Sequence, residues 1–141
     1  MHTFNLGRRS LFGFALASAA TAAAHSAAAV PRAASGDLMV IYVGAGDCAP
    51  CRTFEAEDMP RWQASALSRT VRFVRVAAPK TSQAFNPRYW PKEAKPFIGV
   101  FTAPIVPSFM LVANGRVVAT GGGLRNWRQQ TLPKLEQLAR A

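Results

Sequence analysis

Two cysteines three positions apart are the residues of this sequence best suited to chemistry. They are the two cysteines of the chain and lie in the run Cys48-Ala49-Pro50-Cys51. Only a thiolate attacks a disulfide, and the start of a helix favours a thiolate through its unpaired N–H groups and its dipole. A cysteine one turn along lies on the same face, close enough to close a disulfide. We therefore expect Cys48 to attack a target disulfide and Cys51 to release the resulting mixed disulfide.

Two other uses of the cysteine pair remain open. One is a permanent structural disulfide, although a loop this short restricts the unfolded chain less than a long crosslink would. The other is capture of a soft metal ion such as Cu(I) by two thiolates. Two cysteines cannot build a four-cysteine zinc site, and the two histidines are His2 and His25. We expect neither a metal nor another cofactor, and we favour thiol–disulfide exchange.

The segment 1–29 has the composition of an export signal. Arg8-Arg9 precede an uncharged, alanine-rich run, and Ala27-Ala28-Ala29 offers a small-residue cleavage site. Paired arginines ahead of a weakly apolar stretch are typical of a bacterial twin-arginine signal. The alternative is an uncleaved membrane anchor, because Leu11 to Val30 could just span a bilayer. We expect cleavage and a periplasmic monomer without a membrane span, in an oxidising compartment where cysteine pairs cycle or stay oxidised.

Removal of this signal would take away both histidines and leave residues 30–141, enough for one domain with its own core. Without histidine, Ser-His-Asp and Cys-His catalysis are excluded. The whole chain carries 17 Lys+Arg against 7 Asp+Glu, a net charge of +10. These basic residues are scattered rather than clustered. Together with export, this argues against nucleic acid and for a solvated surface with some attraction to an anionic membrane or anionic partners.

Hydrophobic patterning places the cysteines between a strand and a helix. A flexible arm rich in small residues and proline occupies 30–37, and residues 38–43 form an apolar run typical of a buried parallel strand. Pro50 suits the first turn of a helix. Pro60 is expected to end or bend that helix, and residues 62–67 could continue it. Residues 71–76 predict a second strand.

The last third of the chain predicts a hairpin and a closing helix. Apolar residues at 108–112 and 116–120 flank Asn114-Gly115, a strong hairpin signal. The glycines at 121–123 predict a flexible joint. The closing helix has leucines at helical spacing, and we expect Thr131 to be its N-terminal cap.

This order of elements, with Cys-x-x-Cys at the first strand-to-helix turn and Val106-Pro107 opening a later strand, resembles a thioredoxin-like domain. The resemblance places that domain at 38–141. It implies an α/β fold in which helices flank a central mixed β-sheet, with a cis Val106-Pro107 bond that faces the cysteines. It also implies that Val106 and Pro107 bind substrate, the backbone of Val106 pairing with an extended target chain. Alternatively, Pro107 simply begins a strand where its missing N–H is not needed.

Several features depart from the thioredoxin pattern. Asp47 replaces the usual tryptophan before the first cysteine, and Tyr42 replaces a buried aspartate. The usual N-terminal strand and helix of the family are missing. Negative charge opposes a thiolate, so acids near the cysteines predict a couple nearer the reducing thioredoxins than the strongly oxidising periplasmic enzymes. These acids are Asp47, Glu55, Glu57 and Asp58.

The connection at 77–105 is longer than usual and rich in proline and aromatic residues. Such a stretch inside a compact domain is usually functional or disordered, and disordered segments are poor in aromatics. One interpretation is that Tyr89 and Trp90 bind substrate beside the cysteines, while Arg88, Lys92 and Lys95 attract an acidic partner. The other is that the rings cover the sheet face that the missing N-terminal elements would shield. The rings are Phe85, Tyr89, Trp90, Phe97 and Phe101.

These observations favour a periplasmic thiol–disulfide oxidoreductase that exchanges disulfides with exported proteins and with an unidentified redox partner. The alternative is non-catalytic: a thioredoxin-fold module that docks a partner or holds copper during cofactor assembly. Activity toward a model disulfide that is lost in Cys48→Ser separates these two hypotheses.

Overall fold

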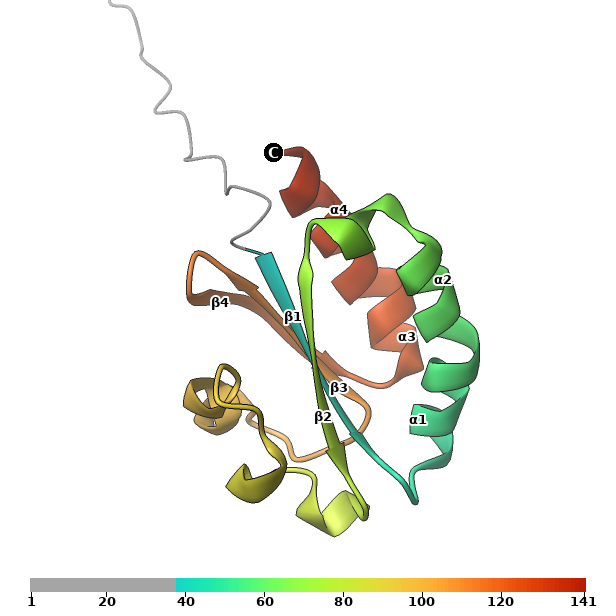
Figure 1. Cartoon of the computed structure of the whole chain (residues 1–141), viewed down its shortest axis with the longest axis vertical. Helices are drawn as coiled ribbons and strands as arrows, with labels where there is room; N and C mark the ends of the chain where they lie inside the picture. Colours follow the sequence, from blue (N-terminus) through green and yellow to red (C-terminus); the bar gives the residue numbers. More distant parts are fainter. Residues whose placement is uncertain (1–37) are drawn as a thin grey trace, which may run out of the picture.

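The computed structural model describes residues 38–141. The predicted signal at 1–29 and the predicted arm at 30–37 lie outside the described residues. Within 38–141, one mixed sheet has the strand order β2-β1-β3-β4 (Figure 1). Strand β1 pairs in parallel with β2 and antiparallel with β3, which pairs antiparallel with β4. The strands are β1 (Leu38–Ala45), β2 (Arg72–Ala78), β3 (Ser108–Ala113) and β4 (Arg116–Gly122).

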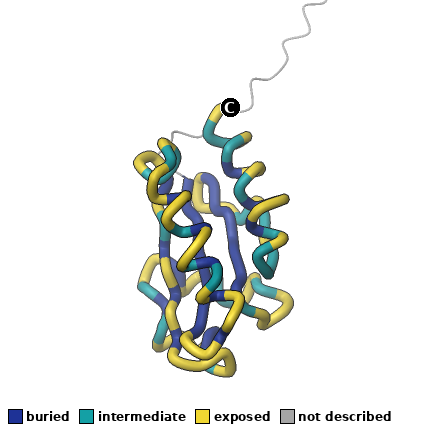
Figure 2. The backbone as a smooth tube through the Cα atoms, turned by 90° about the vertical axis from the view of Figure 1, so that its right-hand side faces the viewer, coloured by how far each residue is buried: buried dark blue, intermediate teal, exposed yellow. Residues whose placement is uncertain are grey.

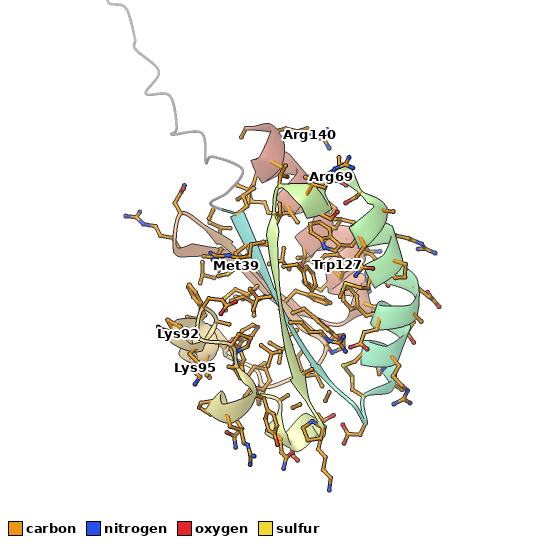
Figure 3. All side chains as sticks on the ribbon, in the orientation of Figure 1. Met39, Arg69, Lys92, Lys95, Trp127 and Arg140 are labelled. Atoms are coloured by element: carbon orange, nitrogen blue, oxygen red, sulfur yellow. A yellow bond between two sulfur atoms is a disulfide. The ribbon has the colours of Figure 1, made fainter. Side chains whose placement is uncertain are left out.

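The central strand β1 is buried on both faces, which explains its continuous apolar run. Its side chains alternate, so that Val40 and Tyr42 lie in one core cluster and Met39 and Ile41 in another. Helices cover the first face, and the connection between β2 and β3 covers the second (Figure 1). Figure 3 labels Trp127 on the helix side and Met39 on the other. Figure 2 shows the buried strands enclosed by more exposed segments.

The helix after the cysteines continues past Pro60. It runs through α1 (Ala49–Thr53), a π-helical turn (Phe54–Asp58) and α2 (Met59–Ala64). A proline lacks an N–H, and its ring clashes with the carbonyl four residues earlier. The wider π-helical turn just before Pro60 changes that spacing, which allows the helix to continue to Ala64.

The C-terminal helix begins earlier than predicted. Strand β4 continues to Gly122, and the helix follows as α3 (Leu124–Asn126), a π-helical turn (Trp127–Thr131) and α4 (Leu132–Arg140). Thr131 therefore lies inside the helix, where its hydroxyl donates to Asn126 Oδ1 at 2.8 Å. The predicted cap at Thr131 is wrong, because a second π-helical turn again precedes a proline.

The predicted flexible joint at 121–123 is a single-residue turn. Gly121 and Gly122 belong to β4, and Gly123 alone of the three has a left-handed φ, +85°. A side chain at Gly121 would meet Asn126, and one at Gly122 would meet Ile105. A larger residue at either position would therefore displace one of these two side chains. By contrast, the predicted hairpin is confirmed, with φ of +51° at Asn114 and +74° at Gly115.

The connection between β2 and β3 holds three short 3-10 helices, Thr81–Gln83, Pro87–Tyr89 and Lys95–Val100. Its apolar side chains pack on the sheet face that carries Met39 and Ile41. The interpretation that this connection covers the sheet is thus confirmed. Among the described residues, no helix is long and apolar enough to cross a membrane.

Candidate active site

Cys48 and Cys51 form a disulfide at the carboxyl end of β1, with their Cα atoms 5.2 Å apart. Cys48 is the N-cap of α1, and its Sγ accepts a hydrogen bond from the Cys51 N–H at 3.1 Å. Pro50 lies in the first helical turn, as predicted. Cys48 is 6% exposed and Cys51 is 1% exposed. Both cysteines are buried, and Cys48 is the more exposed of the two.

The Val106-Pro107 peptide bond is cis, as the resemblance implied. The half-buried side chain of Val106 packs against Ala45, Cys48 and Cys51. Pro107 is buried, and its carbonyl accepts a hydrogen bond from the Gly123 N–H at 2.7 Å. The structure thus brings Val106 to the cysteines from a segment more than fifty positions along the chain. Substrate binding by Val106 and Pro107 stays a prediction.

Trp90 is a core residue, and its role in substrate binding stays a prediction. It is 3% exposed, and its indole N–H donates to the Ala84 carbonyl at 2.8 Å. Its ring centroid lies 6.0 Å from that of Phe85 and 5.8 Å from that of Phe101. The physical reason is that, within residues 38–141, no α-helix covers the sheet face beneath it, and the connection covers that face instead. Trp90 supplies the large apolar area needed there.

Tyr89 is half-buried beside this core. Its hydroxyl donates to Gln83 Oε1 at 3.3 Å, and the Arg88 guanidinium lies 5.2 Å from its ring centroid. Lys92 and Lys95 extend from the outside of the same connection (Figure 3). The described contacts join Tyr89 to the connection and the sheet, and its role in substrate binding stays a prediction.

Asp47, the residue before Cys48, is tied to the connection. Its Oδ1 accepts hydrogen bonds from both the hydroxyl and the backbone N–H of Thr81, at 2.7 Å each. These bonds, the hydroxyl first, hold the pKa of the exposed Asp47 below its usual range. A backbone bond from Gly46 to Ala78, 2.9 Å, joins the same two segments. Sequence reasoning identified Asp47 but missed Thr81, which lies 34 positions away without a local motif.

The other acids near the cysteines are paired with arginines. Glu55 forms an ion pair with Arg75 at 2.6 Å. Arg128 binds Glu57 at 3.0 Å and the buried carboxylate of Asp58 at 2.7 Å, which fastens the first helix to the last. The negative field expected from four acids is therefore compensated at three of them. Asp47 is the acid whose charge bears most directly on Cys48.

Tyr42 occupies the strand position where the family carries an aspartate. It is fully buried, and its ring lies against Phe54 and Phe109, with centroids 4.6 and 5.5 Å away. Its hydroxyl donates to Glu55 Oε1 at 3.1 Å. Burial, followed by the charge of Glu55, raises the pKa of Tyr42 well above its ordinary value of 10.0. The phenol is therefore a neutral hydrogen-bond donor inside the core.

Replacing Tyr42 by phenylalanine should flatten the dependence of stability on pH in alkaline solution. The raised pKa stabilises the fold fully below pH 10, and this contribution is lost as pH rises from there through the folded-state pKa. The wild-type free energy of unfolding should therefore fall by up to about 1.4 kcal/mol per pH unit more than that of Tyr42→Phe. Urea unfolding between pH 9 and 11 measures this difference. Parallel curves for the two proteins would contradict it.

Comparison with known proteins identifies the fold. No protein-family model and no curated protein matches the sequence. The structure is similar to Malassezia sympodialis thioredoxin, with a TM-score of 0.50 and 15% identity over 74% of this chain and 79% of that chain. Spinach chloroplast thioredoxin f in its short form has a TM-score of 0.49 and 18% identity, over 76% of this chain and 80% of that chain. Chlamydomonas reinhardtii thioredoxin f2 has a TM-score of 0.47 and 21% identity, over 73% and 82%.

The chain therefore has a thioredoxin-like fold, a mixed four-stranded sheet with helices packed on it. A disulfide of Cys-x-x-Cys spacing lies at the start of the helix that follows its central strand. Together, this fold and this cysteine pair support a thiol–disulfide oxidoreductase.

Proposed function

We propose that this protein is a periplasmic thiol–disulfide oxidoreductase that acts on exported proteins through Cys48 and Cys51. The observation that carries the proposal is the Cys48–Cys51 disulfide, with the more exposed cysteine at the helix N-cap and Val106 packed against the cluster that both cysteines belong to. A short crosslink of this kind stabilises the fold less than a long one would. Its position at a helix start instead suits reversible exchange.

In the reducing direction, the Cys48 thiolate attacks one sulfur of a target disulfide. A Cys48–target bond forms, and the other target sulfur leaves as a thiolate that takes up a proton. Cys51 then loses its proton and attacks Cys48 Sγ, which releases the second target thiolate and restores the Cys48–Cys51 disulfide. Two electrons pass from the cysteine pair to the target. A dithiol redox partner returns them by the same steps, and the reverse sequence oxidises a target dithiol.

Val106 and Pro107 are proposed to orient the target chain. Val106 is half-buried against the cysteines, so a chain that pairs with its backbone would run directly past Cys48. Pro107 has no N–H that would compete for the target carbonyls. The target would therefore be recognised as an extended segment around its own cysteine.

A stoichiometric thiol assay tests this function. The protein is reduced with excess dithiol, freed of reductant and mixed with oxidised insulin as a model protein disulfide. We expect two insulin thiols to be released for each protein molecule that re-forms its disulfide, because the exchange is a two-electron step. If reduced Cys48 and Cys51 leave insulin oxidised, and oxidised protein also leaves a reduced test peptide unchanged, the non-catalytic binding module is the better hypothesis.

We also propose export by the twin-arginine route with cleavage after Ala29. Arg8-Arg9, the alanine-rich run and the small residues at 27–29 support it. N-terminal sequencing of the protein from the periplasmic fraction should begin near Val30. Full-length protein in the membrane fraction would refute the cleavage.

A further inference from the structure

The segment that carries Cys48 is held to the start of the connection by side-chain hydrogen bonds. Asp47 Oδ1 receives both donors of Thr81 at 2.7 Å, so the orientation of this carboxylate is fixed by one residue. The backbone bond from Gly46 to Ala78 keeps the two segments at that distance. Because Asp47 is exposed, solvent could satisfy it without any partner. The two bonds are therefore not needed to satisfy the carboxylate, and what they do is fix its orientation.

The orientation of the Asp47 carboxylate affects the electrostatic environment of the Cys48 sulfur. When the Cys48–Cys51 bond is reduced, a thiolate develops at Cys48, and an adjacent carboxylate opposes it. Two donors aimed at Oδ1 partly compensate the carboxylate and prevent it from turning freely toward Cys48. The bonds thus soften the repulsion that Asp47 imposes on the thiolate.

We propose that Thr81 is a positioning residue for the redox site, which holds the Asp47 carboxylate and thereby makes the Cys48 thiolate more stable than Asp47 alone would allow. The proposal rests on the proposed exchange function and deepens it, because the thiolate is the attacking species. It also gives the connection a direct influence on the cysteines.

Other charged groups near this segment act on Cys48 alongside Asp47. Lys80, next to Thr81, contributes to the lowered pKa of Asp47. Arg52 donates to the Gly46 carbonyl at 3.1 Å and brings positive charge to the same loop. Glu55 and Arg75, which line a pocket of about 310 Å³ with Gly46 and Arg52, are paired with each other. These groups are the same in all the variants below, so their influence on Cys48 does not change the difference between one variant and another.

The rate at which iodoacetamide alkylates the reduced protein, followed from pH 5 to 10, measures the thiol pKa of Cys48. Cys51 is almost fully buried, so the fast phase reports Cys48. We expect Thr81→Val to raise the thiol pKa and to lower the rate at pH 7 about threefold, equivalent to about half a pKa unit. Thr81→Ser, which keeps both donors, should behave as wild type. An unchanged thiol pKa in Thr81→Val, even with a lowered melting temperature, would reduce Thr81 to a structural contact and overturn the proposal.

A double-mutant cycle shows whether the effect passes through Asp47. Asp47→Asn should raise the rate at pH 7, because the opposing charge is gone. Adding Thr81→Val to Asp47→Asn should then change nothing further. An equal effect of Thr81→Val with and without the carboxylate would overturn the proposal. Alkylation requires only a reduced thiol, so this outcome is independent of whether the protein reduces insulin.

Discussion

Cys48→Ser should abolish disulfide exchange, whereas Cys51→Ser should stop it after the first step. Without the Cys48 thiolate, the buried Cys51 is left as the lone thiol, and it is 1% exposed. Without Cys51, Cys48 still attacks, but no thiol releases the mixed disulfide. With oxidised insulin as target, Cys51→Ser should therefore accumulate a covalent adduct visible on non-reducing gels. Multiple turnover should fall in both variants to the rate of the buffer alone.

The two variants control for each other. Both lose the same disulfide and replace sulfur by oxygen, so both should have the same melting temperature within a few degrees. A static structural disulfide predicts equal loss of stability and no adduct in either variant. An adduct that forms equally through Cys51 in the Cys48→Ser protein would contradict the assignment of Cys48 as the attacking sulfur.

Trp90→Ala should destabilise the fold by about 3–5 kcal/mol, as expected for removal of a large buried aromatic side chain. The ring is 3% exposed, and its N–H bond to Ala84 would also be lost. Chemical unfolding followed by circular dichroism measures the change. Tyr89→Ala is the matched control, because it removes a neighbouring aromatic ring that is only half-buried, and its effect should be clearly smaller.

A different outcome for Trp90→Ala would support a role of Trp90 in substrate binding. That result is a Trp90→Ala protein with wild-type stability and activity toward a small disulfide, but with slowed turnover of insulin. Trp90→Phe separates packing from hydrogen bonding. It should recover most of the stability, because it refills much of the same volume.

Local patterns predicted the parts of this molecule that local chemistry controls. The apolar run at 38–43, the cysteine pair at a helix start and Asn114-Gly115 each act within a few residues. Pattern and structure agree at all three. Hydrophobic patterning, cysteine spacing and the Asn-Gly turn therefore predict the strand, the disulfide and the hairpin from local sequence alone.

Two π-helical turns and long-range packing account for the features that sequence patterns did not settle. Pro60 was expected to end or bend the helix, with 62–67 as a possible continuation, and the helix does continue to Ala64 through a π-helical turn. Thr131 resembles a helix cap in sequence, but it lies inside a helix because a π-helical turn precedes the proline there as well. Trp90 lies in a stretch rich in proline and aromatic residues, which suggested binding. Its burial follows from packing of the connection on the sheet face, a long-range contact. Thr81 meets Asp47 through the return of the chain after β2.

The connection between β2 and β3 has a consequence for how this protein can change in length. Surface loops usually tolerate insertions and deletions, because little of the core depends on them. Here the loop is itself the second layer over the sheet, and residues such as Ala84, Trp90 and Ala94 are as buried as the central strand β1. Shortening it would expose a broad apolar face and promote association. Natural variation in the length of this chain should therefore be found at other loops, such as the tip of the β3–β4 hairpin.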